Sequence, residues 1–177
     1  MQSTIKNLLL ILLTLTITPL ASHDLKGAVA SEDRNPKNTL RDSSRNPVET
    51  LSFFGIESDM VVIELSPGGG WYTEILANYI HYPGTLIAAH WSKDSEIAYY
   101  RRGRANFEKK MSNNPMYGRV EIVDLYSELA EENSVDAVLT FRNLHNWLGP
   151  NLDNIFSNTF KSLKPGGIFG IVEHRAK

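Results

Sequence analysis

Short apolar runs recur along the chain from residue 60 onward, and amphipathic stretches with apolar residues at helical spacing separate them. The apolar runs are predicted strands at 60–65, 84–90, 119–125, 135–141 and 166–174. The amphipathic stretches are predicted helices at 71–80, 95–113 and 151–163. Strands that alternate with helices are typical of a parallel sheet covered on both faces. The pattern therefore predicts one doubly wound α/β domain over residues 47–177.

The first residues form a separate block. Lys6 is the only charged residue among the first 20, and the core at 8–13 is wholly apolar. A positive start, a short apolar middle and small residues after it are typical of a secretory signal peptide. The apolar part is shorter than the ~20 residues that a membrane-spanning helix needs. We expect a signal peptide within 1–30, cleaved after Ala21 or Ala30, export to the bacterial periplasm, and no stable membrane span after cleavage.

A polar stretch connects this block to the predicted domain. Residues 31–46, "SEDRNPKNTLRDSSRN", mix charges with Pro, Asn and Ser and show little apolar periodicity. This composition predicts a polar linker or a loosely attached arm. The next stretch, "NPVETLSFFGI", places Pro47 in a first helical turn and Gly55 at a helix end. We expect a short helix there that covers one face of the sheet.

Composition narrows the classes of function. The length of 177 residues suits about one domain. The net charge of −2 argues against a general attraction to nucleic acid or to anionic membranes. The absence of cysteine excludes disulfides, thiolate metal sites and cysteine nucleophiles. No His, Asp and Glu residues have convincing metal-ligand spacing, so we predict no metal site. From the net charge we predict no nucleic-acid partner.

Three glycines follow the first predicted strand in "VVIELSPGGGWYTEIL". Glycine lets the backbone turn tightly and approach a ligand, and the next helix begins with free N–H groups. Open parallel sheets bind ligands at the carboxyl ends of their strands. We therefore expect a small ligand to lie across Gly68, Gly69 and Gly70.

The spacing of this turn argues against a dinucleotide cofactor. A G-x-G-x-x-G fingerprint would need glycine where Ser66 and Trp71 stand, and an acidic residue where His90 ends the second strand. A nicotinamide-dependent oxidoreductase is therefore disfavoured.

An acidic-x-G-x-G-x-G pattern fits better, with Ser66 in place of the first glycine. In this form the turn resembles motif I of the class I S-adenosylmethionine-dependent methyltransferases. "GTLIAAHW", "IVDL" and "FKSLKPGGIFGIVEH" resemble later segments of that family, in the same order. Together with "LTFRNLHNW", they make the chain most similar to a group of exported bacterial proteins described as predicted methyltransferases. The resemblance covers roughly residues 46–177 and implies a Rossmann-like sheet of the class I type.

The resemblance also implies S-adenosyl-L-methionine as the cofactor and a small molecule as the methyl acceptor. In the family, motif I lies beside the methionine end, the second strand ends beside the ribose, and the third ends beside the adenine. The corresponding positions are Glu64, Ser66, Gly68, Gly69 and Gly70 for the methionine side, His90 for the ribose and Asp124 for the adenine.

Two features depart from the family. His90 replaces a carboxylate that would accept two ribose hydrogen bonds, whereas a neutral imidazole accepts only one. The family core has seven strands, whereas this sequence stops at "EHRAK", just after the fifth. An exposed apolar edge invites pairing. The sequence therefore indicates either a truncated domain, or an oligomer or partner that covers the fifth strand.

The stretch "FRNLHNW" after the fourth strand supplies candidates for the acceptor side. Histidine is the residue type whose unperturbed pKa lies near neutrality, so His145 is the predicted general base, and Asn143 is predicted to orient the cofactor or the acceptor. The alternative is that His145 only packs and hydrogen-bonds in a loop. Glu173, His174 and Arg175 end the fifth strand on the same side, where they either bind an acceptor or form a solvated strand end.

Two classes of function remain open. The motif order favours a small-molecule methyltransferase. The changes at Ser66 and His90 are also compatible with a non-catalytic exported binding or structural protein on a degenerate methyltransferase fold. Export adds weight to this alternative, because S-adenosylmethionine is made in the cytoplasm and is charged.

Overall fold

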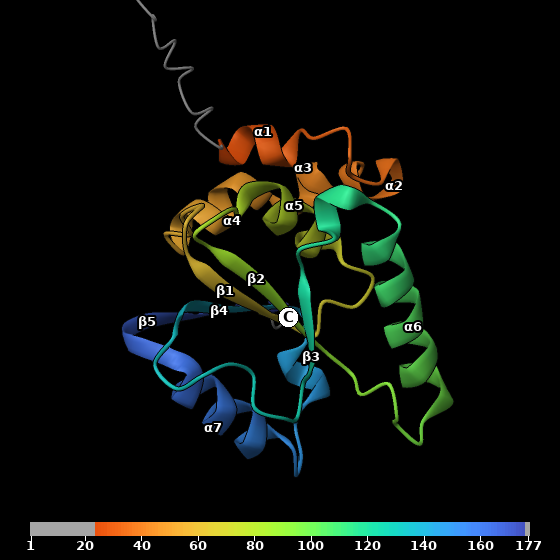
Figure 1. The fold of residues 1–177 in the computed structure, drawn as a ribbon, viewed down its shortest axis with the longest axis vertical. Helices are drawn as coiled ribbons and strands as arrows, with labels where there is room; N and C mark the ends of the chain where they lie inside the picture. The colour runs from red at the N-terminus through yellow and green to blue at the C-terminus, as the bar shows by residue number, and fades with distance from the viewer. Residues whose placement is uncertain (1–23, 176–177) are drawn as a thin grey trace, which may run out of the picture.

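A parallel sheet forms the centre of the fold. The computed structural model describes residues 24–175, and its five strands follow the order β3-β2-β1-β4-β5. The strands are β1 Val61–Leu65, β2 Thr85–His90, β3 Glu121–Asp124, β4 Val135–Phe141 and β5 Leu163–Val172. All neighbouring strands are parallel. The order of connection reverses between β1 and β4, and sheets of this kind bind ligands beside such a point at their carboxyl edge (Figure 1).

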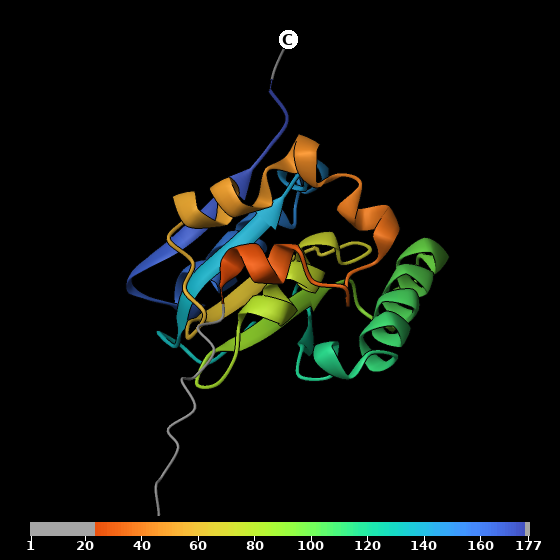
Figure 2. The same cartoon turned by 90° about the horizontal axis from the view of Figure 1, so that it is seen from above.

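Helices cover both faces of this sheet, which confirms the doubly wound prediction. They are α1 Leu25–Val29, α2 Pro36–Thr39, α3 Asp42–Arg45, α4 Pro47–Phe53, α5 Trp71–Tyr79, α6 Ala98–Ser112 and α7 Leu152–Ser162, with 3-10 turns η1 Pro115–Tyr117 and η2 Leu144–Asn146. In Figure 1, α1, α4 and α5 lie above the strands and α7 lies below them. Figure 2 shows the N-terminal helices beside α5, with α6 at the flank.

The core is divided into two apolar clusters by the sheet. Successive strand residues point to opposite faces. Val62 of β1 packs in the cluster with α4, α5 and α6. Ile63 packs in the other cluster, which contains Trp147, directly after η2, and Ile155 of α7. Because both faces are covered, both side chains are fully buried. This explains why the strand sequences are nearly continuous apolar runs rather than alternating ones.

The segment 31–46 is folded against the domain, which differs from the predicted linker or loosely attached arm. Buried Arg34 donates hydrogen bonds to both carboxylate oxygens of Asp42, at 2.7 and 2.9 Å. Buried Glu74 of α5 accepts a hydrogen bond of 2.9 Å from the side chain of Asn38. Polar contacts rather than apolar packing attach much of the segment, so its low hydrophobicity hid the attachment.

The predicted signal peptide lies mostly outside the described residues, which begin at Asp24. Leu25 and Ala28 of α1 are buried in the core cluster that includes α5. Cleavage after Ala30 would remove them, whereas cleavage after Ala21 would retain α1. Within the described part of the chain, no helix has the length and hydropathy that crossing a bilayer requires.

The strand β5 lies at one edge of the sheet, and residues 24–175 supply no further strand beside it. Ile171 of β5 and Phe160 of α7 are exposed. The covering of this edge by a partner or a second copy stays a prediction.

Candidate functional site

The turn between β1 and α5 has an unusual backbone. Ser66, Gly68 and Gly70 have positive φ angles of 53°, 58° and 76°. Glycine adopts such angles freely, whereas Ser66 is held there at a cost. A Cβ atom added to Gly68 or Gly69 would meet no heavy atom within 4 Å. The turn therefore presents open backbone at the carboxyl edge of the sheet, directly before the first residue of α5.

A cavity of 520 Å³ opens between this turn and α6. Its walls include Gly68, Gly69, Trp91, Tyr99 and Phe107. The volume lies in the range of pockets that hold small molecules. Aromatic walls offer surface on which a flat ring can pack. The site predicted from the sequence therefore adjoins a real hollow in the structure.

Glu64 lies beneath the turn rather than facing this cavity. Its side chain is buried in β1, and its Oε2 accepts a hydrogen bond of 2.6 Å from the hydroxyl of Thr73 in α5. Burial raises the pKa of the Glu64 carboxyl to about 7, although the Thr73 hydrogen bond and the charge of Lys110 oppose the rise. Glu64 thus supports the start of α5 from below.

His90 is almost fully buried, and both of its ring nitrogens are occupied. Nδ1 accepts a hydrogen bond of 2.8 Å from the main-chain N–H of Trp91. Nε2 therefore carries the proton and donates to the carbonyl of Gly68, at 3.2 Å. Burial lowers the pKa of His90 below its ordinary value, which keeps the ring neutral. The side chain holds the glycine turn, and this use differs from the predicted contact with a ribose.

Asp124 ends β3 in register with His90 of β2. Its Oδ1 accepts a hydrogen bond of 2.9 Å from Arg104 of α6, which also donates to the carbonyls of Trp91 and Val123. The carboxylate is partly exposed. Asp124 is thus at the edge where the sequence placed it, but one of its oxygens is already used in an ion pair.

Lys110 of α6 is a residue of the site that the sequence did not reveal. Its Nζ donates to the carbonyl of Gly69 at 2.7 Å and to that of Gly70 at 3.3 Å. It also pairs with the buried carboxylate of Glu74 at 2.6 Å. All three ammonium donors are therefore used. No motif marks this lysine, because its partners lie on α5 and on the turn about forty residues earlier.

Asn143 connects the end of β4 to the same turn. Its side-chain N–H groups donate to the carbonyl of Ser66 at 3.1 Å and to the hydroxyl of Thr140 at 3.2 Å. Asn143 was predicted to orient the cofactor or the acceptor, whereas the hydrogen bonds in this structure orient the backbone of the turn. The preceding residue, Arg142, has a positive φ of 63°, which marks a sharp reversal of the chain after β4.

His145 and Glu173 form a pair at the same edge. Nδ1 of His145 lies 2.9 Å from Oε2 of Glu173, and the ring of His174 lies 5.5 Å from that of His145, between centroids. The sequence left open whether Glu173 binds an acceptor or is a solvated strand end. In the structure its carboxylate contacts the ring of His145. No three His, Asp or Glu side chains gather as a metal site in the described part of the chain.

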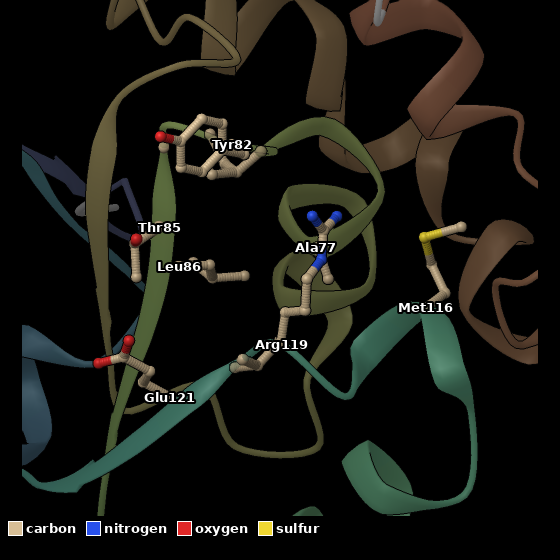
Figure 3. A pocket seen from close by; sticks show the side chains of 10 residues that line it. Ala77, Tyr82, Thr85, Leu86, Met116, Arg119 and Glu121 are labelled. Carbon is tan, nitrogen blue, oxygen red and sulfur yellow. The ribbon is translucent and has the colours of Figure 1, made fainter.

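A second hollow, of 270 Å³, lies at the amino ends of the strands, opposite the edge that carries the glycine turn. Figure 3 shows it between α5 and the amino ends of β2 and β3, with Leu86 and Ala77 on its walls and Arg119 reaching across it. None of the predicted site residues lines it. The chemistry predicted from the sequence is therefore confined to the carboxyl edge.

Comparison with solved structures gives several matches with the same fold. A SAM-dependent methyltransferase from Aquifex aeolicus is 18% identical with a TM-score of 0.63, and the match covers 87% of this chain and 77% of that one. The [4+2]-cyclase SpnF is 17% identical with a TM-score of 0.59, covering 86% and 57%. The glycopeptide N-methyltransferase MtfA, complexed with S-adenosylmethionine, is 20% identical with a TM-score of 0.51, covering 69% and 47%. This chain thus spans less than two thirds of the last two proteins.

Sequence comparison supplies the family. A search of curated proteins gives no match. The sequence model of the family described as "Methyltransferase domain" matches residues 63–171, which include the end of β1 from Ile63 onward, the glycine turn and all but the last residue of β5. This match covers well over half of the chain, and it agrees with the fold and with the position of the turn. The chain belongs to the methyltransferase domain family.

Proposed function

We propose that this chain is an S-adenosylmethionine-dependent methyltransferase that acts on a small-molecule acceptor. The observation that carries the proposal is the glycine turn, which follows β1 where the strand order reverses and has open space over Gly68 and Gly69. Membership of the methyltransferase domain family supports methyl transfer as the reaction. The complex of MtfA with S-adenosylmethionine supports the choice of cofactor for this fold.

The residues around the turn fit this cofactor in two respects. The glycine backbone leaves room for a ligand to pass closely, and Trp91 and Tyr99 offer aromatic surface to an adenine. The ribose is the exception, because the hydrogen bonds of His90 to Gly68 and Trp91 use both ring nitrogens. Each missing hydrogen bond costs about 1 kcal/mol. We therefore expect weaker cofactor binding than a carboxylate at this position would give.

When bound, the cofactor supplies an electrophilic methyl group, and the task of the protein is to align the acceptor and to handle any proton it loses. Asn143 fixes the backbone of the turn, so it acts as a positioning residue. His145 is exposed at the same edge of the sheet. We assign to His145 the role of accepting a proton from the acceptor.

Calorimetric titration with S-adenosylmethionine and S-adenosylhomocysteine tests the cofactor site. Gly68→Asp puts a carboxylate into the open space over the turn, and Asp tolerates a positive φ better than most residues. Gly55→Asp is the matched control, because Gly55 also has a positive φ, 64°, and no heavy atom near an added Cβ. We expect binding to the wild type and to Gly55→Asp, and at least tenfold weaker binding to Gly68→Asp.

Two results would overturn the proposal. One is equal affinity of the wild type and Gly68→Asp, which would place the ligand away from the turn. The other is a folded wild type that binds neither compound. That result would favour the non-catalytic alternative on the same fold.

A further inference from the structure

Glu173 is held at three points just after the end of β5. Its Oε2 accepts from Nδ1 of His145 at 2.9 Å and from the main-chain N–H of His174 at 3.1 Å. Its Oε1 accepts from the main-chain N–H of Leu144 at 3.0 Å. The carboxylate thus connects the turn η2, which follows β4, to the segment that follows β5. A side chain that only faced solvent at a strand end would not be fixed in this way.

We propose that Glu173 is a positioning residue that holds His145 as a general base, and that the methyl acceptor therefore carries an O–H or N–H proton that it loses on transfer. This inference rests on the proposed function, because it concerns the acceptor side of the same site.

The geometry decides which nitrogen of His145 is the base. A carboxylate only accepts hydrogen bonds, so Nδ1 of His145 must donate to Glu173. In the neutral ring, Nε2 is then the nitrogen with a free lone pair. The side chain of His145 is 48% exposed at the carboxyl edge, and Nε2 is the atom assigned to the contact with the acceptor. The neighbouring titratable groups that the structure places against this ring are Glu173 and His174.

Glu173 also suits the second half of this role. Burial is the largest single influence on its carboxyl and raises the pKa, but the hydrogen bonds from His145, His174 and Leu144 and the charge interaction with His145 together outweigh burial and leave the pKa below its ordinary value. The group is therefore an anion at neutral pH. An anion at Nδ1 stabilises the imidazolium that forms when Nε2 takes a proton.

The chemical step balances with this assignment. A lone pair of the acceptor oxygen or nitrogen forms the new bond to the methyl carbon, and the bond from that carbon to sulfur breaks. The electron pair of the broken bond stays on sulfur, so the sulfonium becomes a neutral thioether. The acceptor proton goes to Nε2 of His145, and Glu173 keeps its charge. No oxidant, reductant or metal is required.

The first test is nitrogen NMR of the His145 ring in the purified protein without ligand. We expect the proton of the neutral ring on Nδ1 in the wild type, and a shift of the population toward the Nε2 form in Glu173→Ala. Glu173→Gln keeps an acceptor oxygen, so it should preserve the wild-type pattern. His145→Gln assigns the signals, and Glu121→Gln at the opposite edge of the sheet is the control. A ring that is unchanged in Glu173→Ala would overturn the positioning role.

The second test uses turnover, followed as formation of S-adenosylhomocysteine. Phenols, hydroxy acids and primary amines carry the required proton, whereas thioethers and tertiary amines do not. We expect methylation only in the first group, and at least a tenfold fall in kcat for Glu173→Ala, with partial rescue in Glu173→Gln and an unchanged KM for S-adenosylmethionine. Methylation confined to the proton-free acceptors would overturn the inference.

The two tests separate this inference from the proposed function. If the folded wild type does not bind S-adenosylmethionine, the proposed function fails, whereas the NMR result still shows whether Glu173 orients His145. If the cofactor binds and the ring does not respond to Glu173→Ala, only the inference fails.

Discussion

Glu64 offers a direct test of how the buried end of β1 responds to pH. Its side chain is 3% exposed, and burial raises its pKa to about 7 from an ordinary value of 4.5. The Thr73 hydroxyl already donates to it at 2.6 Å, so a neutral acceptor of the same shape can keep that contact. The perturbation is therefore Glu64→Gln, which retains size and a hydrogen-bond acceptor and removes the titration.

The direction of the effect follows from the sign of the pKa change. A folded-state pKa above the unfolded value means that the folded protein binds this proton more tightly than the unfolded chain does. The stabilisation is fully present below pH 4.5 and is lost as the pH rises through about 7. The two pKa values differ by about 2.5, and each unit corresponds to about 1.4 kcal/mol. The wild type should therefore lose about 3 kcal/mol of unfolding free energy relative to Glu64→Gln over this range.

Urea unfolding of both proteins at about pH 4.5, 5.5, 6.5 and 8 measures this difference on both sides of the titration of Glu64. Other titrating groups are common to both proteins, so their contributions cancel in the comparison. Glu121→Gln, at an exposed position of β3, should give a difference that does not vary with pH. A wild-type to Glu64→Gln difference that stays constant within about 0.5 kcal/mol would refute the reasoning.

Two further predictions concern the attachment of the N-terminal segment and of α6, and both are measured by urea unfolding. Lys110→Met should destabilise the protein by about 3 kcal/mol, because it leaves the carboxylate of Glu74 buried without its nearest cation. Adding Glu74→Gln should recover part of this loss. A double variant that recovers none of the lost stability would contradict this explanation. Leu25→Ala should cost about 2 kcal/mol because Leu25 is buried in the core, whereas Leu40→Ala, at a side chain 82% exposed, should change stability by less than about 0.5 kcal/mol. Equal effects of the two leucine changes would show that α1 does not contribute to the core.

The strands were predictable because covering both faces of a parallel sheet requires nearly continuous apolar runs. The residues at which the strands begin and end were less predictable. The fifth strand was predicted from 166, whereas β5 begins at Leu163, because "KPGG" has the composition of a turn. Pro165 is tolerated there because the register of β4 and β5 shifts between Leu163 and Ile168, and a strand can lack one N–H donor at such an irregularity. The pairing of Leu163 with Val135, which extends β5 beyond this irregularity, involves a residue of another strand and is not visible in the local sequence.

The candidate site was predictable in place but only partly in role. Glu64, His90, Asp124 and His145 all lie at or next to the carboxyl ends of strands, as the pattern of strands requires. The direction of each side chain depends on partners from other elements. Glu64 turns under α5 to meet Thr73, for example, and a single sequence carries no signal of that contact.

The contacts that hold the glycine turn were not predictable for the same reason. Three side chains from three parts of the fold donate to its carbonyl groups: His90 at the end of β2 to Gly68, Lys110 of α6 to Gly69 and Asn143 after β4 to Ser66. These pairs are separated by 22, 41 and 77 residues in the sequence, so no motif contains them.

Because these carbonyl groups are already bound, the backbone of the turn is fixed before a ligand arrives, and the space over Gly68 and Gly69 stays open. Preorganisation of this kind reduces the entropy lost on binding. His90, which stands where the family resemblance implies a carboxylate, thus stabilises the backbone of the turn beside the proposed ligand site.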